Sequence, residues 1–237
     1  MQQIAFLIAV FEFVLLLFSL SFHECAHAWM ASRLGDQTAR LEGRVTLNPM
    51  YHIDPVGTLL IPALAIFGPF IGLSFFSGFL IGWAKPTPVI TRNFRKIKRD
   101  ENLVTLAGPA SNLLLVLISV VILLAVVHIV PGGRTLVIAT FRGAMVDGVG
   151  SGLQAIVLLA VLSILVNLSL FFFNLLPVPP LDGSHLLANA LPYNAAQAYY
   201  RIPYLVSWIL MIFVGGFILR ILMGPSLGII GFLLRHA

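Results

Sequence analysis

Charged residues are scarce in this chain. Asp, Glu, Lys and Arg together make up 10% of its 237 residues, whereas hydrophobic residues make up 59% and the mean hydropathy is +1.00. An average water-soluble domain contains about 25% charged residues. The composition therefore excludes a soluble globular domain, and it also excludes disordered, collagen-like and coiled-coil chains.

Cysteine is nearly absent, because Cys25 is the only one in the chain. A single thiol cannot form an internal disulfide, so a small disulfide-stapled fold is excluded. Acidic residues are few as well, with nine Asp and Glu against fourteen Lys and Arg, which gives a net charge of +5. The basic residues lie in short loops between apolar runs, as in the cytoplasmic loops of membrane proteins, and we therefore expect no nucleic-acid partner.

Four long stretches contain no charged residue at all. They are residues 55–84, 102–133, 148–181 and 202–219. A helix needs about 20 apolar residues to cross a hydrocarbon core roughly 30 Å thick, and a further apolar run covers residues 4–33. The sequence therefore predicts an all-α polytopic membrane protein with about four to six transmembrane helices. We expect residues 1–237 to form a single integral-membrane domain surrounded by a lipid bilayer.

The ends of several helices can be predicted from breakers. Gly35 is a plausible stop for the helix over residues 4–33. We expect further helices over residues 102–130, 153–176 and 202–222. The last apolar piece, residues 224–234, is too short to cross a bilayer straight, so it is expected at the membrane interface.

The stretch 55–84 differs from the other apolar stretches, because Pro and Gly residues interrupt it and basic residues flank it on both sides. Arg44 precedes it and Lys85 follows it. Since basic loops stay on the cytoplasmic side, both flanks are expected on one side, which predicts a re-entrant element. Just before it, residues 40–47 alternate enough to predict a short membrane-associated β segment that could pair with a substrate.

The first apolar run contains the sequence His23-Glu24-Cys25-Ala26-His27, which is an HExxH motif. On a helix the two histidines lie on one face about 6 Å apart along the axis, so both imidazoles can bind one Zn²⁺. Glu24 lies beside such a metal and can accept a proton from its water. Ionisable groups within hydrocarbon are expensive and usually functional, although a polar cap at the end of a span is the alternative interpretation.

A catalytic zinc site needs a third protein ligand. Asp182 is the leading candidate, because it directly follows the charge-free stretch 148–181, at the inward end of a predicted span. An N-cap for a short helix beginning near Ser184 is the other interpretation of this aspartate. His52 and His185 stay open as alternative ligands.

Three motifs together resemble the site-2 protease family of intramembrane zinc metalloproteases, peptidase family M50. The motifs are the HExxH at residues 23–27, Gly-Pro-Ala-Ser-Asn at residues 108–112, and Asn-x-x-Pro-x-x-x-Leu-Asp-Gly at residues 174–183. The segments between them, Asn48-Pro49, His52-Ile53-Asp54-Pro55 and Gly82-Trp83-Ala84-Lys85-Pro86, resemble the short prokaryotic form of the family, without PDZ or CBS domains. The resemblance covers roughly residues 19–187. Their combination within apolar spans is more specific than HExxH alone.

The resemblance implies regulated intramembrane proteolysis by a zinc metalloendopeptidase. One Zn²⁺ per chain would be held by His23, His27 and Asp182, with Glu24 as the catalytic base. Asn112 and Asn174 would bind an extended stretch of the substrate, a transmembrane protein that is cleaved in or near its transmembrane segment. These two amides could equally form hydrogen bonds between helices.

Two other functions could use intramembrane His and carboxylate groups. A multipass metal-ion or proton transporter could bind its cargo with the same residues. A histidine-box di-iron oxidase would need more clustered histidines than the six present. We favour the protease and expect it in the cell membrane, with its active site toward the cytoplasmic side, because Arg33, Arg40 and Arg44 follow the first helix.

Overall fold

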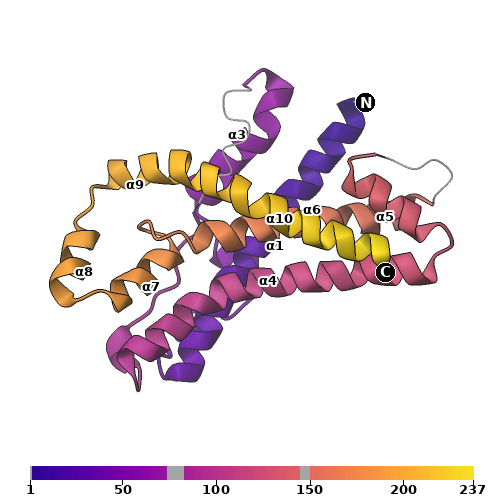
Figure 1. Cartoon of the computed structure of the whole chain (residues 1–237). Coiled ribbons are helices and arrows are strands. Elements are labelled where there is room, and N and C mark those ends of the chain that lie inside the picture. Colours follow the sequence, from indigo (N-terminus) through magenta and orange to yellow (C-terminus); the bar gives the residue numbers. More distant parts are fainter. Residues whose placement is uncertain (1, 74–82, 145–149) are drawn as a thin grey trace.

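The computed structural model describes residues 2–73, 83–144 and 150–237 (Figure 1). In these residues four helical runs are long and apolar enough to cross a membrane. They are α1 (Gln2–Leu34), α4 (Ile97–Ile129), α6 (Ser151–Asn174) and a C-terminal run over Tyr204–His236. The predicted all-α polytopic fold class is therefore confirmed.

Shorter helical elements connect these four runs. Between α1 and α4 lie α2 (Thr38–Leu41), η1 (Pro49–Tyr51), η2 (Pro55–Leu60), α3 (Ile61–Phe67), η3 (Gly68–Ile71) and η5 (Thr91–Asn93). After α4 come α5 (Gly133–Phe141) and, beyond α6, α7 (Asp182–Ala190) and α8 (Tyr193–Tyr200). The C-terminal run consists of α9 (Tyr204–Leu210), the π-helical turn η6 (Met211–Gly215) and α10 (Gly216–His236).

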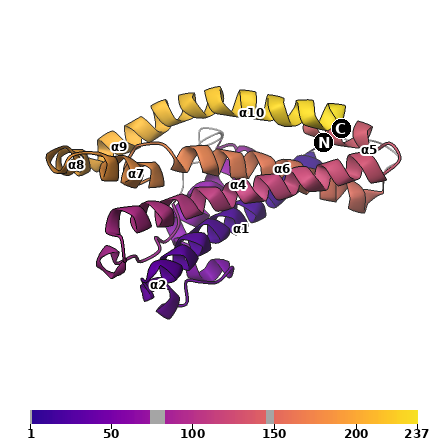
Figure 2. The same cartoon turned by 60° about the horizontal axis from the view of Figure 1, so that its bottom comes forward.

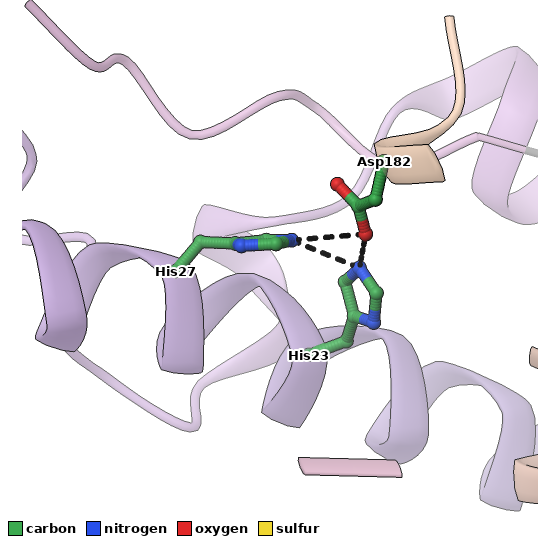
Figure 3. Close-up of side chains that lie close together, drawn as sticks. All are labelled: His23, His27 and Asp182. Carbon is green, nitrogen blue, oxygen red and sulfur yellow. Dashed lines mark hydrogen bonds and ion pairs between the residues drawn. The ribbon is translucent and has the colours of Figure 1, made fainter. Parts of the chain in front are cut away.

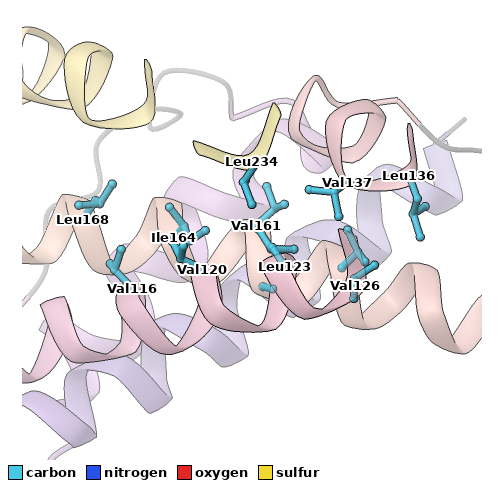
Figure 4. Close-up of a cluster of buried hydrophobic side chains, with 12 residues drawn as sticks. Val116, Val120, Leu123, Val126, Leu136, Val137, Val161, Ile164, Leu168 and Leu234 are labelled. Carbon is cyan, nitrogen blue, oxygen red and sulfur yellow. The ribbon is translucent and has the colours of Figure 1, made fainter. Parts of the chain in front are cut away.

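Helices α1, α4 and α6 form the central bundle, in which α4 packs against both of the others. The buried face of α1 is rich in small residues, with Ser19, Ala28 and Ala31 completely buried. Small side chains allow helix backbones to approach closely, which favours helix packing inside a membrane. At the far end of α4, a cluster of aliphatic side chains joins α4, α5, α6 and the end of α10, where Leu234 packs (Figure 4).

The two ends of the stretch 55–84 lie next to each other and are joined by backbone hydrogen bonds. The Trp83 N–H donates to the Gly57 carbonyl at 3.2 Å, and the Lys85 N–H donates to the His52 carbonyl at 2.8 Å. The two flanks therefore lie side by side, as a re-entrant hairpin requires. Residues 74–82 of this predicted element lie outside the described residues. Helix α3 packs on α1, where the ring of Phe67 contacts the rings of Phe6 and Phe13.

The predicted β segment at residues 40–47 is wrong. Thr38–Leu41 form α2, and the described parts of the chain contain no strand. Asp36 lies before the N-cap Gln37, and its carboxylate accepts hydrogen bonds from the Thr38 N–H and hydroxyl in a local turn, while Gly43 at φ 72° follows the helix. The alternation of residues 40–47 has no neighbouring strand to pair with among the described residues, so it forms no strand.

The predicted break near Gly224 is also absent. α10 continues through Pro225 to His236, so the C-terminal run is one apolar helix of 33 residues. Proline removes one backbone donor, the one that would bond to the carbonyl four residues earlier, and transmembrane helices tolerate this loss through local adjustment of the backbone.

Candidate metal centre

Three residues predicted as metal ligands lie together between α1 and the start of α7 (Figure 3). The Nε2 atoms of His23 and His27 are 3.0 Å apart. Asp182 Oδ2 lies 3.1 Å from His23 Nε2 and 3.4 Å from His27 Nε2. Both histidines are buried, and Asp182 is half-buried. Residues that are 155 positions apart thus share one small site.

The segment after α6 carries Asp182 to the histidines. Pro177, Pro179 and Pro180 end the helix, and the chain turns back on itself before α7. Gly183 permits this turn, because a Cβ at this position would overlap the Leu175 carbonyl. Asp182 is the first residue of α7, whose N-cap is Leu181, so the N-cap interpretation of this aspartate is wrong.

Both imidazoles are held from behind by oxygen atoms of α4. His27 Nδ1 lies 2.7 Å from the Val104 carbonyl oxygen, and His23 Nδ1 lies 2.7 Å from Asn112 Oδ1. A carbonyl oxygen only accepts hydrogen bonds, so His27 must donate from Nδ1. In the neutral imidazole the lone pair is then on Nε2, on the side of Asp182. Partners of this kind orient metal-binding histidines in proteins.

The arrangement of these atoms fits a zinc ion. Asp182 Oδ2 is buried and finds no hydrogen-bond donor among the described residues. Two Nε2 lone pairs and this oxygen therefore converge, and three acceptors so close repel one another unless a cation lies between them. Ligands about 2.0–2.1 Å from Zn²⁺ at tetrahedral angles are about 3.3 Å apart. The separations of 3.0, 3.1 and 3.4 Å match this value.

The electrostatics of Asp182 suit a ligand as well. Burial raises the pKa of its carboxyl, but in the metal-free site the positive charge that His27 carries when protonated, together with hydrogen bonds from both histidines, outweighs burial and holds this pKa below its ordinary value. A divalent cation bound between the ligands is also positively charged, so it too would favour the ionised form of Asp182. Asp182 is therefore ionised, as a carboxylate ligand must be.

Gly108 gives the centre its space on the side of α4. A Cβ at this position would lie 2.5 Å from His23 Nε2 and even closer to His27 Nε2, which real Cβ atoms do not tolerate. Any residue other than glycine would therefore fill the space between the two metal-binding nitrogens. This close approach explains a glycine within an otherwise regular helix.

Glu24 is held by a residue that the sequence analysis missed. Its Oε2 accepts hydrogen bonds from the Thr87 N–H at 3.1 Å and from the Thr87 hydroxyl at 2.8 Å. Thr87 lies between Pro86 and Pro88 in the segment without regular secondary structure that leads from Trp83 to η5. Prolines favour an extended backbone, but nothing in the sequence connects this segment to α1.

The two asparagines predicted to bind substrate occupy different surroundings. Asn112 is completely buried, with its Oδ1 on His23 and its Nδ2 donating to Asn167 Oδ1 at 2.9 Å. Asn174 is half-buried at the end of α6, and its Nδ2 donates to the Leu170 carbonyl on the same helix. Substrate binding by either residue stays a prediction.

The alternative ligands lie apart from the cluster. His52 Nε2 contacts the Thr46 carbonyl oxygen at 2.9 Å, and His185 lies beside Tyr200. Neither belongs to the group of ligand atoms formed by the HExxH histidines and Asp182.

Comparison with known proteins points to one family. The model of peptidase family M50 matches residues 11–214. The chain is 36% identical over 202 residues to the protein named "Putative zinc metalloprotease YwhC" of Bacillus subtilis (strain 168), which covers 83% of this chain and 78% of that relative.

More distant relatives bear similar names. The chain is 32% identical over 167 residues to "Putative zinc metalloprotease Rip2" of Mycobacterium tuberculosis (strain H37Rv), which covers 70% of this chain and 52% of the relative. No solved structure matches the chain. Because the family match covers most of the chain, including every residue of the metal-ligand cluster, the chain belongs to peptidase family M50 and is a membrane-embedded zinc metalloprotease.

Proposed function

We propose that this chain hydrolyses peptide bonds in or near the transmembrane segments of membrane-protein substrates, using a single Zn²⁺ held by His23, His27 and Asp182. One observation carries the proposal. The two histidines are buried on α1, a helix apolar enough to cross a membrane, so the ligand cluster forms part of a membrane span. Ionisable groups in such a position are by default functional.

The chemistry divides between the metal and Glu24. A bound zinc ion would polarise the peptide carbonyl and lower the pKa of the attacking water. Glu24 accepts a proton from this water as the new C–O bond forms, and it passes the proton to the nitrogen of the leaving amine as the C–N bond breaks. Thr87 binds Oε2 of the carboxylate. We therefore assign the proton transfer to Oε1.

The substrate must be extended where it is cut, because the peptide bonds of a helix are shielded by their own hydrogen bonds. Asn174 is the better of the two predicted substrate-binding residues, since it is half-buried and directly precedes the segment that carries Asp182. Asn112 is fully buried behind His23, with both ends of its amide engaged.

We also propose that the centre faces the cytoplasmic side of the cell membrane. Arg33 follows His27 by six residues, about 9 Å along a helix, and Arg40 and Arg44 come next. Basic residues concentrate on the cytoplasmic ends of spans. A cysteine introduced at Arg40 should react with a membrane-impermeant thiol reagent only from the cytoplasmic side, and labelling from outside would reverse this orientation.

The decisive test is Glu24→Gln in the purified, reconstituted chain with a single-pass membrane protein as substrate. The variant should keep one zinc per chain by elemental analysis, because Glu24 is not a ligand, while cleavage falls by about 10²–10⁴-fold. Cleavage at the unsubstituted rate would contradict the role of Glu24. The transporter alternative finds no support in the family match, and zinc uptake into vesicles would be its signature.

A further inference from the structure

A continuous line of buried amides runs from the metal centre into the middle of the bundle. His23 Nδ1 on α1 contacts Asn112 Oδ1 on α4 at 2.7 Å, and Asn112 Nδ2 donates to Asn167 Oδ1 on α6 at 2.9 Å. Asn167 Nδ2 then donates to the Ser163 backbone carbonyl, again at 2.9 Å. Asn112 and Asn167 are 0% and 1% exposed. This amide relay thus links three helices to one imidazole.

The amide relay has only one possible direction, which is set at its far end. The Ser163 carbonyl can only accept, so the NH₂ group of Asn167 must face it and Oδ1 must face Asn112. Asn112 must then present its own NH₂ group to Asn167 and its oxygen to His23. An oxygen at this position requires a hydrogen on His23 Nδ1.

We infer that Asn167 is a positioning residue for the metal centre: acting through Asn112, it fixes the hydrogen of His23 on Nδ1 and leaves the Nε2 lone pair for a metal ion. This inference rests on the metal site of the function proposed above. If the hydrogen were on Nε2 instead, it would point toward Asp182 Oδ2, 3.1 Å away, and would occupy the space between these two atoms that a metal ion needs. His27 reaches the same state more directly, through the Val104 carbonyl.

The cost of burying Asn167 supports a role beyond packing. An amide in the apolar interior of a membrane protein is costly unless its hydrogen bonds are satisfied, and an aliphatic residue would fill this place on α6 more cheaply. Without Asn167, the Asn112 amide could turn over and present its NH₂ group to His23. The tautomer of His23 would then no longer be determined.

The first test reads the tautomer directly in metal-free, ¹⁵N-histidine-labelled protein. The ¹⁵N shifts of His23, identified by their loss in His23→Ala, should report hydrogen on Nδ1. In Asn167→Leu they should report both tautomers. Hydrogen on Nε2 in the unsubstituted protein would overturn the inference, and this measurement needs no variant at position 167 to fold.

The second test compares zinc affinities by chelator competition. Asn167→Leu should weaken zinc binding about tenfold or more, as loss of the hydrogen-bond partner of a ligand does elsewhere. Ser169→Ala is the matched control on the same helix, because the Ser169 hydroxyl contacts Met223 Sδ on α10 at 3.9 Å, outside the amide relay. Equal losses in both variants, or none in Asn167→Leu, would overturn the inference.

Neither measurement uses a substrate. A chain that showed the expected tautomer and zinc affinities but cleaved no membrane protein would therefore refute the proposed function and leave the role of Asn167 intact. Conversely, normal cleavage together with an Nε2 hydrogen on His23 would refute only the role of Asn167.

Discussion

The central bundle and the C-terminal helix are built from similarly apolar sequences but have different roles. In its most apolar window, α6 has 44% of its residues buried, whereas the C-terminal run has 17%. α10 arches over the bundle (Figure 2) and packs on it along one side only, through Met223, Leu227, Ile230 and Leu234. Side chains such as Phe213 and Ile229 face outward.

Hydropathy therefore indicates a membrane span but not what the span faces. In the bundle, small residues bring helices close enough for buried His and Asn side chains to find partners on neighbouring helices. The C-terminal run has no acidic residue and exposes most of its aliphatic surface, as a helix in contact with lipid does. Substitutions that affect the metal site should accordingly be confined to the bundle, and the same Gly→Ala change should have little effect in the C-terminal run.

Gly108→Ala in the bundle should have the largest effect. The added methyl group would occupy the space between His23 Nε2 and His27 Nε2, so the ligands must separate or the metal is excluded. We expect zinc content well below one per chain and a loss of cleavage of about 10²-fold or more. Elemental analysis and the single-pass substrate assay measure both. Full zinc occupancy with normal turnover would show that α4 lies farther from the centre.

Thr87→Val should have an intermediate effect. It removes the hydroxyl that donates to Glu24 Oε2 at 2.8 Å but keeps the backbone donor and the shape of the side chain. A hydrogen bond to a charged group contributes about 1.5–3 kcal/mol, so kcat should fall by about 10–10²-fold with KM and zinc content unchanged. Thr87→Ser should restore the rate. A change confined to KM would instead indicate that Thr87 contacts the substrate.

Asp36→Asn should alter stability in a manner that depends on pH. Burial raises the pKa of this carboxyl, but hydrogen bonds from Thr38, Ile90 and Asn93 outweigh burial and hold the pKa below its ordinary value. Its stabilisation is therefore complete above about pH 4, near the pKa of the unfolded chain, and is lost as the pH falls toward the folded pKa.

We expect Asp36→Asn to lower the free energy of unfolding at pH 7 by about 1–2 kcal/mol. The difference between variant and unsubstituted protein should shrink below pH 4. Thermal unfolding in detergent at several pH values measures this difference. The other carboxylates contribute equally in both proteins, so their effect on the difference cancels. A difference that grew on acidification would mean that the pKa of Asp36 is raised rather than lowered.

Gly216→Ala in the C-terminal run should have the smallest effect. An added Cβ at this helical position meets nothing within 4 Å. Alanine favours a helix over glycine by about 0.5–1 kcal/mol, so the variant should be as stable as the unsubstituted protein or slightly more so. Zinc content and cleavage should not change. The same substitution at Gly108 is expected to lower the zinc content well below one per chain. A loss of zinc in Gly216→Ala as well would contradict the conclusion that the C-terminal run takes no part in the metal centre.

Much of the metal centre could be predicted because it depends on short-range spacing. His23 and His27 share a helix face through the helical repeat alone, and Asp182 was found because it follows a long charge-free stretch. Thr87 and Asn167 were missed, since each acts through a partner more than fifty residues away and belongs to no spaced motif. Their importance depends on which helices become neighbours.

The wrong predictions have the same origin. The alternation at residues 40–47 predicts a strand only if another strand lies beside it, and Thr38–Leu41 form a helical turn there instead. The separate piece predicted over residues 224–234 is part of α10, which continues through Pro225. In both cases the residue pattern alone was ambiguous, and the surrounding structure decided it.

The sequence by itself determined that this chain lies in a membrane, because hydrocarbon-length runs without charge have no stable place in water. It also determined that one helix carries two imidazoles and a carboxylate in a metal-binding register. Only the tertiary structure decided which side chains hold these groups in place. Hydrogen bonds between helices depend on the packing of small residues over the whole bundle, and no local pattern specifies that packing.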